Sequence, residues 1–149
     1  MDLADFAESC FVLDLETFVS ALITNRTNAS VAKVQAIIAR GCKTITRVRK
    51  EMNDFQEGSW SSNDLDGIST HSIDKKLQLV AAEMIEVCID NGLDVSASSI
   101  RNKILLIAVS KIEKAAIITV DIRPTEISMS SLCRIFGVTC VDFAQITGY

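Results

Sequence analysis

Few side chains in this sequence could carry out acid–base or metal chemistry. The single histidine, His71, lies among serine and threonine residues, with no cysteine or carboxylate at a metal-ligand spacing. Glu83 and Glu86 are three residues apart, so both carboxylates lie on one side of a helix, but the histidine of an ExxH motif is missing. These two side chains are therefore expected to be solvated carboxylates.

The five cysteines form neither a metal-binding nor a disulfide pattern. No CxxC pair occurs, and Cys133 and Cys140 by themselves supply two ligands at most. An odd number of cysteines, most of them inside apolar runs, is typical of free thiols buried in a reducing compartment. Glycine-rich phosphate loops and a GxSxG nucleophile motif are absent as well. We therefore predict no enzyme, no catalytic residue, no metal and no cofactor.

The most regular pattern is a basic face on a long helix predicted near residues 31–55. Apolar residues recur there at spacings of 3, 4, 3, 4, 3, 4 and 3, the heptad spacing of one helix face. No acidic residue occurs between Val31 and Lys50. Gly41 lies in the apolar seam, where it either permits close approach of another backbone or breaks the helix in two. The candidate residues for binding a polyanion or a protein partner are Lys33, Arg40, Lys43, Arg47, Arg49 and Lys50.

Length and composition favour one helical domain. The chain of 149 residues fits a single domain, 1–149, with a flexible loop near 56–71 between its halves. One proline and six glycines are few for a turn-rich β protein, and the 48% of apolar residues with only 5% aromatics predicts an aliphatic core. We therefore predict an all-α fold, a compact bundle of five to seven helices, in which Trp60 anchors the loop to the core.

The remaining elements are placed by their periodicity and caps. Asp14 is a plausible N-cap, the pair Asn91 and Gly92 is a helix stop, and Gly137 supplies a turn. The β-branched stretch 117–122 is either a short strand or an extended tail. Further helical segments are predicted over 2–24 (one bent helix or two short ones), from Ser72 to Asn91, over 97–114, and over 128–149 as helix, turn and helix.

Three stretches in the C-terminal half follow one another in a familiar order: 80–85, 99–108 and 132–139, the last ending in Gly-Val-Thr. This order resembles the later helices of a cyclin-type repeat, as in transcription factor IIB, with a helix-turn-helix-like end. The resemblance implies an all-α fold that binds proteins or nucleic acid and has no catalytic site. The last predicted helix offers Asp142 and Gln145 but no base, so this unit is not expected to read DNA.

Charge is segregated along the chain although the net charge is only −4 and the pI is near 5.0. An acidic N-terminal segment precedes the basic face, and acidic residues follow it. Neither a secretory signal nor a membrane span is expected, which predicts an intracellular protein, cytoplasmic or nuclear. These features favour a non-enzymatic interaction or assembly module that is oligomeric through self-association or a protein partner. The alternative is a nucleic-acid-binding protein, transcription- or RNA-related, that uses the basic face over 31–50.

Overall fold

The chain folds around a five-stranded parallel sheet. The computed structural model describes residues 1–54, 65 and 67–149. Every neighbouring pair of strands is parallel, and the order across the sheet is β3-β2-β1-β4-β5. The strands are β1 (Phe11–Leu13), β2 (Cys42–Ile45), β3 (Ile68–His71), β4 (Ala116–Thr119) and β5 (Cys140–Asp142). The prediction of an all-α helical bundle is therefore wrong.

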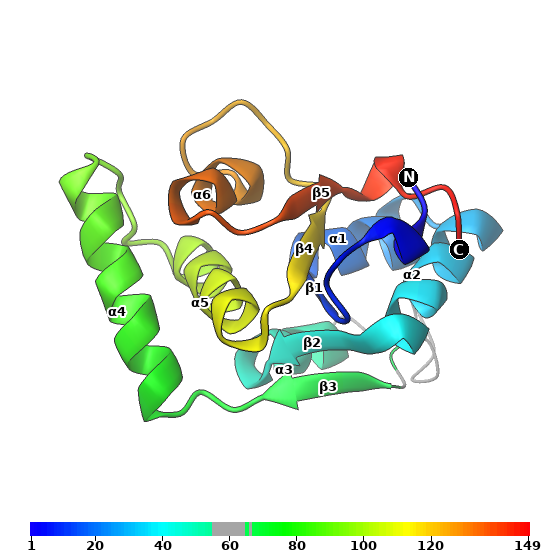
Figure 1. Ribbon diagram of the computed structural model, residues 1–149, viewed down its shortest axis with the longest axis horizontal. Coiled ribbons are helices and arrows are strands. Elements are labelled where there is room, and N and C mark those ends of the chain that lie inside the picture. Colours follow the sequence, from blue (N-terminus) through cyan, green and yellow to red (C-terminus); the bar gives the residue numbers. More distant parts are fainter. Residues whose placement is uncertain (55–64, 66) are drawn as a thin grey trace.

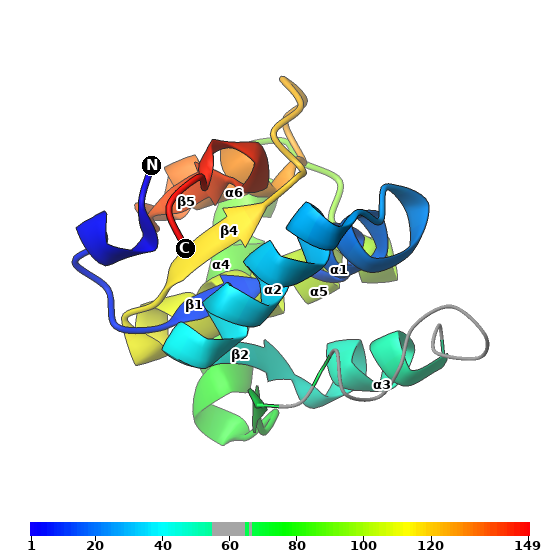
Figure 2. The same cartoon turned by 90° about the vertical axis from the view of Figure 1, so that its right-hand side faces the viewer.

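Helices cover both faces of this sheet (Figure 1). The principal helices are α1 (Leu15–Val19), α2 (Asn28–Gly41), α3 (Thr46–Asp54), α4 (Lys75–Asp90), α5 (Ser98–Glu113) and α6 (Met129–Phe136). Helix α5 packs on β1, β2 and β4, and α4 packs on α5, so that α4 forms the outermost layer on that side. Helix α2 packs on β1, β2 and β3 from the other side, and Figure 2 looks onto this face. Short turns of 3-10 or π-helix complete the chain: η1 (Leu3–Asp5), η2 (Ser20–Thr24) and η4 (Phe143–Gln145).

The central strands are buried on both faces, which explains why β1 was not predicted. All three residues of β1 and all four of β4 are buried, so neither strand shows the alternation of apolar and polar residues that marks a half-exposed strand. β1 lies inside the segment 2–24 that was predicted to be helical. β4 agrees with one of the two predictions for the β-branched stretch 117–122, the short strand.

The long helix predicted near 31–55 is two helices with a strand between them. Gly41 ends α2 with φ of +116°, a conformation that L side chains rarely adopt, so the break at Gly41 is confirmed. Cys42–Ile45 then pairs with β1 on one side and β3 on the other. The heptad spacing continued through this strand because most of its residues are buried, and burial rather than helical geometry placed apolar residues there.

Several local signals are confirmed, whereas the resemblance to a cyclin-type repeat is not. Asp14 is the N-cap of α1, Asn91 is the C-cap of α4, and Gly137 ends α6 with a positive φ. The second helix of the predicted terminal unit is instead β5 followed by the 3-10 turn η4. A parallel sheet is not the all-α fold that the resemblance implies.

Part of the predicted loop lies outside the described residues. Trp60, proposed as an anchor, belongs to the segments 55–64 and 66 that the structure does not describe. The end of the predicted loop, Ile68–His71, forms β3. Among the helices of the described part of the chain, none is long and apolar enough to cross a membrane.

Candidate functional site

The sheet has a topological switch point between β1 and β4. From β1 the chain moves outward to β2 and β3 on one side, and it later returns to β4 and β5 on the other. In open parallel sheets the crevice at such a point, beyond the carboxyl ends of the strands, is the usual ligand site. Asp14 follows the last residue of β1, and Asp121 comes two residues after β4. Two carboxylates therefore meet at the position where a ligand would be expected.

Asp14 is held by hydroxyl and amide donors rather than by a cation. Its Oδ1 accepts hydrogen bonds from the backbone N–H of Thr17 (3.0 Å) and from the Thr17 hydroxyl, and its Oδ2 accepts one from the Thr119 hydroxyl (2.8 Å). The side chain is buried, and burial raises the pKa of Asp14 above its usual value, with a further contribution from the charge of Asp121. The hydrogen bonds from Thr17 and Thr119 oppose this shift but do not cancel it, so the pKa of Asp14 stays raised.

Asp121 is equally buried but is surrounded by positive charge. Its Oδ2 lies 2.5 Å from Lys103 Nζ and accepts the Met129 N–H at 2.9 Å, and its Oδ1 accepts Arg123 Nε–H at 2.8 Å. Burial alone would raise the pKa of this carboxyl, but the hydrogen bonds from Arg123, Lys103 and Met129 outweigh it and lower the pKa. Asp121 is therefore an ionised carboxylate whose charge is already neutralised within the chain.

A second set of polar side chains lies beside this pair. Asn102 of α5 donates to Glu51 Oε1 (3.2 Å) and accepts from Arg47 Nη1 (3.2 Å), which ties α3 to α5. These residues border a small cavity of about 90 Å³. The residues that line the cavity are Asp14, Leu15, Val48, Glu51, Ser99, Asn102, Lys103 and Leu106.

The arrangement does not offer a ready divalent-cation site. A hard cation such as Mg²⁺ needs several carboxylate or carbonyl oxygens around one point. Within the described residues, no three His, Cys, Asp or Glu side chains come close enough together to hold a metal ion. The ammonium group of Lys103 supplies the positive charge that Asp121 requires.

The six basic residues predicted as a binding site do not share one face. Lys33 and Arg40 belong to α2, Lys43 to β2, and Arg47, Arg49 and Lys50 to α3. Lys33 Nζ donates to the Phe143 carbonyl (3.0 Å) and lies 4.6 Å from the centre of the Phe143 ring. A continuous basic stripe over 31–50 is therefore not present.

Lys43 and His71 converge on one carboxylate at the amino end of β4. Glu113 Oε2 lies 3.0 Å from Lys43 Nζ, and Glu113 Oε1 lies 3.0 Å from His71 Nδ1. The hydrogen bond from Lys43, with a smaller one from His71, lowers the pKa of Glu113. The lone histidine of the sequence thus has a carboxylate partner 42 residues away along the chain, which no local motif predicted.

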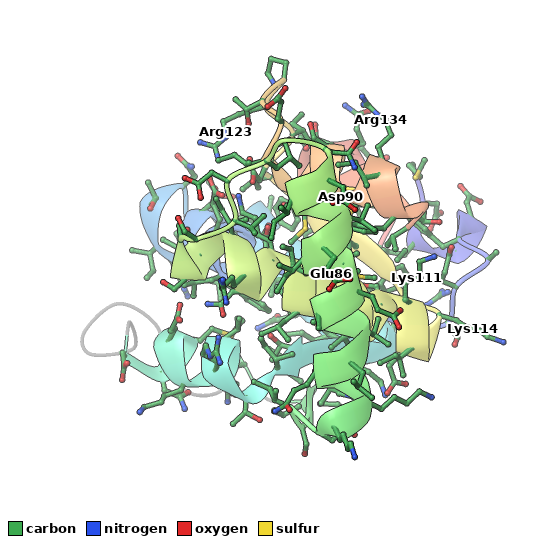
Figure 3. The ribbon with its side chains drawn as sticks, turned by 90° about the vertical axis from the view of Figure 1, so that its left-hand side faces the viewer. Glu86, Asp90, Lys111, Lys114, Arg123 and Arg134 are labelled. Carbon is green, nitrogen blue, oxygen red and sulfur yellow. The ribbon has the colours of Figure 1, made fainter. Side chains whose placement is uncertain are left out.

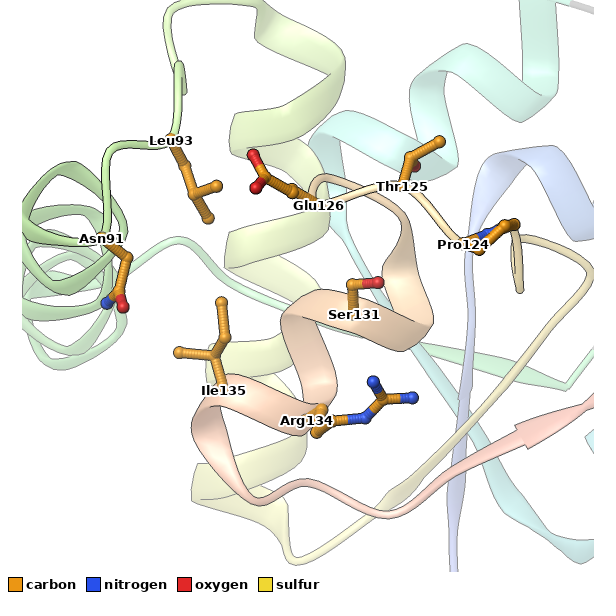
Figure 4. Close-up of a pocket in the computed structure, with 8 residues that line it drawn as sticks. All are labelled: Asn91, Leu93, Pro124, Thr125, Glu126, Ser131, Arg134 and Ile135. Carbon is orange, nitrogen blue, oxygen red and sulfur yellow. The ribbon is translucent and has the colours of Figure 1, made fainter.

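An open pocket lies between the end of α4 and α6 (Figure 4). Its volume is about 480 Å³, within the range of sites that hold ligands. It is formed where the end of α4, the segment after β4 and α6 meet, and it is lined by Asn91, Leu93, Pro124, Thr125, Glu126, Ser131, Arg134 and Ile135. Ile135 is 39% exposed and Ile127, on the adjacent segment, is 37% exposed. Apolar surface of this kind beside polar groups is typical of a site that binds another molecule.

Comparison with known proteins places the fold. No protein-family model matches this sequence, and no curated protein matches it. The structure is similar to the crystal structure of FitAcB from Neisseria gonorrhoeae. The similarity has a TM-score of 0.66 and covers 91% of this chain and 99% of the FitAcB chain, at 11% sequence identity. At this identity the similarity concerns the fold, and it agrees with a parallel α/β architecture.

Sequence reasoning did not find Asp121, Lys103 or Asn102 as a group. Asp14 was recognised only as a helix cap, and Asp121 stood in a stretch assigned as strand or tail. The sequence did contain a signal. Asp14 and Asp121 each follow a short β-branched or aliphatic run, which is the pattern of a strand end in a parallel sheet. The helical interpretation of residues 2–24 concealed it.

Proposed function

We propose that this chain is a non-catalytic protein-binding module whose ligand is a segment of another protein held in the pocket between α4 and α6. The observation that carries the proposal is the pocket itself, because it joins an open volume of about 480 Å³ with exposed apolar side chains.

The lining of the pocket indicates the chemistry of the segment. Leu93 and Ile135 offer aliphatic surface from two different elements, so an aliphatic side chain of the ligand would be buried between them. Arg134 adds a guanidinium that suits a carboxylate, and Glu126 adds an acceptor for a backbone N–H. The expected ligand is a short segment that combines an aliphatic anchor with an acidic residue.

The switch-point cluster supports a role without catalysis. Lys103 and Arg123 neutralise Asp121, and Asp14 accepts hydrogen bonds from Thr17 and Thr119. Both carboxylates are thereby engaged in holding α1, β4 and α6 together. This leaves the outer pocket as the open feature of the described surface with the best match to a binding role.

Selection from a random peptide library tests the proposal. Peptides selected on the wild-type protein are expected to carry the aliphatic and acidic pair, and Ile135→Asp and Arg134→Glu should each weaken their binding by about tenfold or more, as measured by calorimetry. Arg40→Glu, an exposed arginine on α2, is the matched control and should leave the affinity unchanged. Equal loss in the control, or selected peptides that bind the Ile135→Asp variant normally, would overturn the proposal.

A second candidate function is cation-dependent hydrolysis of nucleic acid phosphodiesters. It is favoured by one observation: Asp14 and Glu51 line the same small cavity, and Arg47 is hydrogen-bonded to Asn102, which also lines it. Carboxylates of this kind can hold divalent ions that activate water, and the arginine could contact phosphate. The residues present fit such an ion poorly, because the ammonium group of Lys103 already forms an ion pair with Asp121.

The two candidates differ in what they predict for Mn²⁺. The protein-binding module predicts no Mn²⁺ binding and no cleavage of a mixed single-stranded RNA by the wild-type chain. In Lys103→Asp the ammonium group is removed and a carboxylate is added, so this variant should gain Mn²⁺ binding, detectable by electron paramagnetic resonance. Wild-type protein that binds Mn²⁺ and cleaves the RNA, with loss of cleavage in Asp121→Asn, would favour the hydrolase instead.

A further inference from the structure

Helix α4 has one covered face and one open face. Leu77, Ala81, Met84 and Cys88 are buried on the side toward α5. A second seam with spacings of 4, 3, 4 and 3 lies about 200° around the helix from the first, since successive residues are 100° apart. Its members are Lys75, Leu79, Ala82, Glu86 and Ile89. Leu79 is 58% exposed and Ile89 is 57% exposed, although both are large aliphatic residues.

The charges on this open face run against the helix dipole. Lys75 and Lys76 occupy the first turn, where the helix end is positive, and Asp90 occupies the last turn, where the end is negative. Glu86 lies one turn before Asp90, and Figure 3 shows both carboxylates on the outer side of α4. In the described part of the chain none of these four side chains forms an ion pair. An isolated helix with this charge order is less stable than one with the reverse order.

We propose that α4 is the interface of a symmetric homodimer in which the two α4 helices pack antiparallel through this open face. An antiparallel second copy brings Lys75 opposite Asp90 of the partner subunit, and it places Lys76 about one helical turn from Glu86 of the partner subunit. The twofold axis repeats both pairings. The charge order that is unfavourable within one helix is therefore complementary between two copies.

The apolar residues of the seam fit the same arrangement. The midpoint of α4 lies between Ala82 and Glu83. In the antiparallel register about that point, the small side chain of Ala82 lies at the crossing and lets the two backbones approach closely. Leu79 and Ile89 flank the crossing, where they contact the aliphatic stems of Glu86 and Lys76 from the other copy. The dimer thus covers two of the most exposed aliphatic side chains of the described surface.

Other charges near α4 do not change this pairing. Lys111 lies in the last turn of α5 and Lys114 is the C-cap of that helix, and Figure 3 labels both. Neither forms an ion pair with Glu86 or Asp90 within the chain. Arg134 belongs to the pocket on α6 and lies outside the seam.

Charge reversal of each half of the face tests the dimer. Sedimentation equilibrium should show a wild-type dimer, and Lys75→Glu with Lys76→Glu should raise its dissociation constant by roughly a hundredfold because like charges then face each other. Glu86→Lys with Asp90→Lys should do the same. An equimolar mixture of the two double variants should restore the dimer, because an acidic α4 then faces a basic α4.

The design separates loss of association from loss of folding. Both double variants should keep their far-ultraviolet circular dichroism, and Lys75→Glu with Lys76→Glu also suits the helix dipole. Arg40→Glu with Lys50→Glu reverses two exposed charges on other helices and should leave the dimer intact. A monomeric wild-type chain, double variants that remain dimeric, or a mixture that stays monomeric would each overturn the proposal.

Discussion

Lys103 Nζ lies 2.5 Å from Asp121 Oδ2, and this ion pair joins α5 to the segment that follows β4. The Asp121 side chain is fully buried and that of Lys103 is 15% exposed. Asp121 also accepts the Met129 N–H, so the same carboxylate fixes the first turn of α6. The pair therefore occupies the switch point and holds one wall of the outer pocket in place.

Removal of the ammonium group should destabilise the fold. Lys103→Met leaves a buried carboxylate with Arg123 as its only cation, so we expect the free energy of unfolding in urea to fall by about 2–3 kcal/mol. Arg123→Met is the matched control, because Arg123 is 60% exposed and its contact with Asp121 is screened by solvent. Its cost should stay below about 1 kcal/mol. Equal costs for the two substitutions would contradict the buried character of the Lys103 contact.

Asp14 should make the stability depend on pH in a direction opposite to that of an ordinary ion-paired carboxylate. Burial raises the pKa of Asp14 in the folded chain, so the folded state holds this proton more tightly than the unfolded state. The contribution of Asp14 is fully present below its unfolded pKa, about 4, and is lost as the pH rises through the folded pKa. Asp14→Asn keeps a carbonyl acceptor for the Thr17 N–H but does not titrate.

Urea titrations of both proteins across this pH range check the prediction. The stability of the wild type relative to Asp14→Asn should decline from acid toward neutral pH and then level off. A difference that stays constant with pH would show that folding leaves the pKa of Asp14 unchanged, and one that grows with rising pH would show a stabilised carboxylate; either result contradicts the prediction.

Two glycines with positive φ should respond differently to alanine. Gly41 has φ of +116°, which no L residue adopts without strain, so Gly41→Ala should cost about 2 kcal/mol in thermal or urea unfolding. Gly137 has φ of +66° and no atom within 4 Å of the position of an added Cβ, so Gly137→Ala should cost about 1 kcal/mol. The reverse order would contradict the larger backbone strain assigned to an alanine at position 41.

Cys140 should be the most reactive thiol at neutral pH among the five cysteines. A hydrogen bond from Cys133 lowers the pKa of Cys140, whereas burial raises the pKa of Cys42 to about 12 and also raises that of Cys10. Brief alkylation followed by peptide mass spectrometry should therefore label Cys140 first. Cys133→Ala removes the hydrogen bond and should slow this labelling. Faster labelling of Cys10, the other half-buried cysteine, would contradict the prediction.

The local signals in the sequence proved sufficient for the ends of several elements. Asp14 caps α1, Asn91 caps α4, and Gly41 ends α2, because a cap or a positive φ depends on residues within one turn of the helix. The prediction of free cysteines was also correct, since the described chain contains no disulfide. The lack of a helix long and apolar enough to span a membrane, among the residues that the structure describes, also follows from composition.

Only the tertiary structure revealed the parallel sheet and the polar cluster around Asp14 and Asp121. β1 and β4 are buried on both faces, so their residues carry no alternation that distinguishes a strand from a buried helix. The hydrogen bond between Thr119 and Asp14 joins residues 105 positions apart, and a contact of that range leaves no trace in local spacing. The heptad pattern across Gly41 arose from burial in two helices and a strand, and only the parallel pairing of Cys42–Ile45 distinguished this arrangement from one long helix.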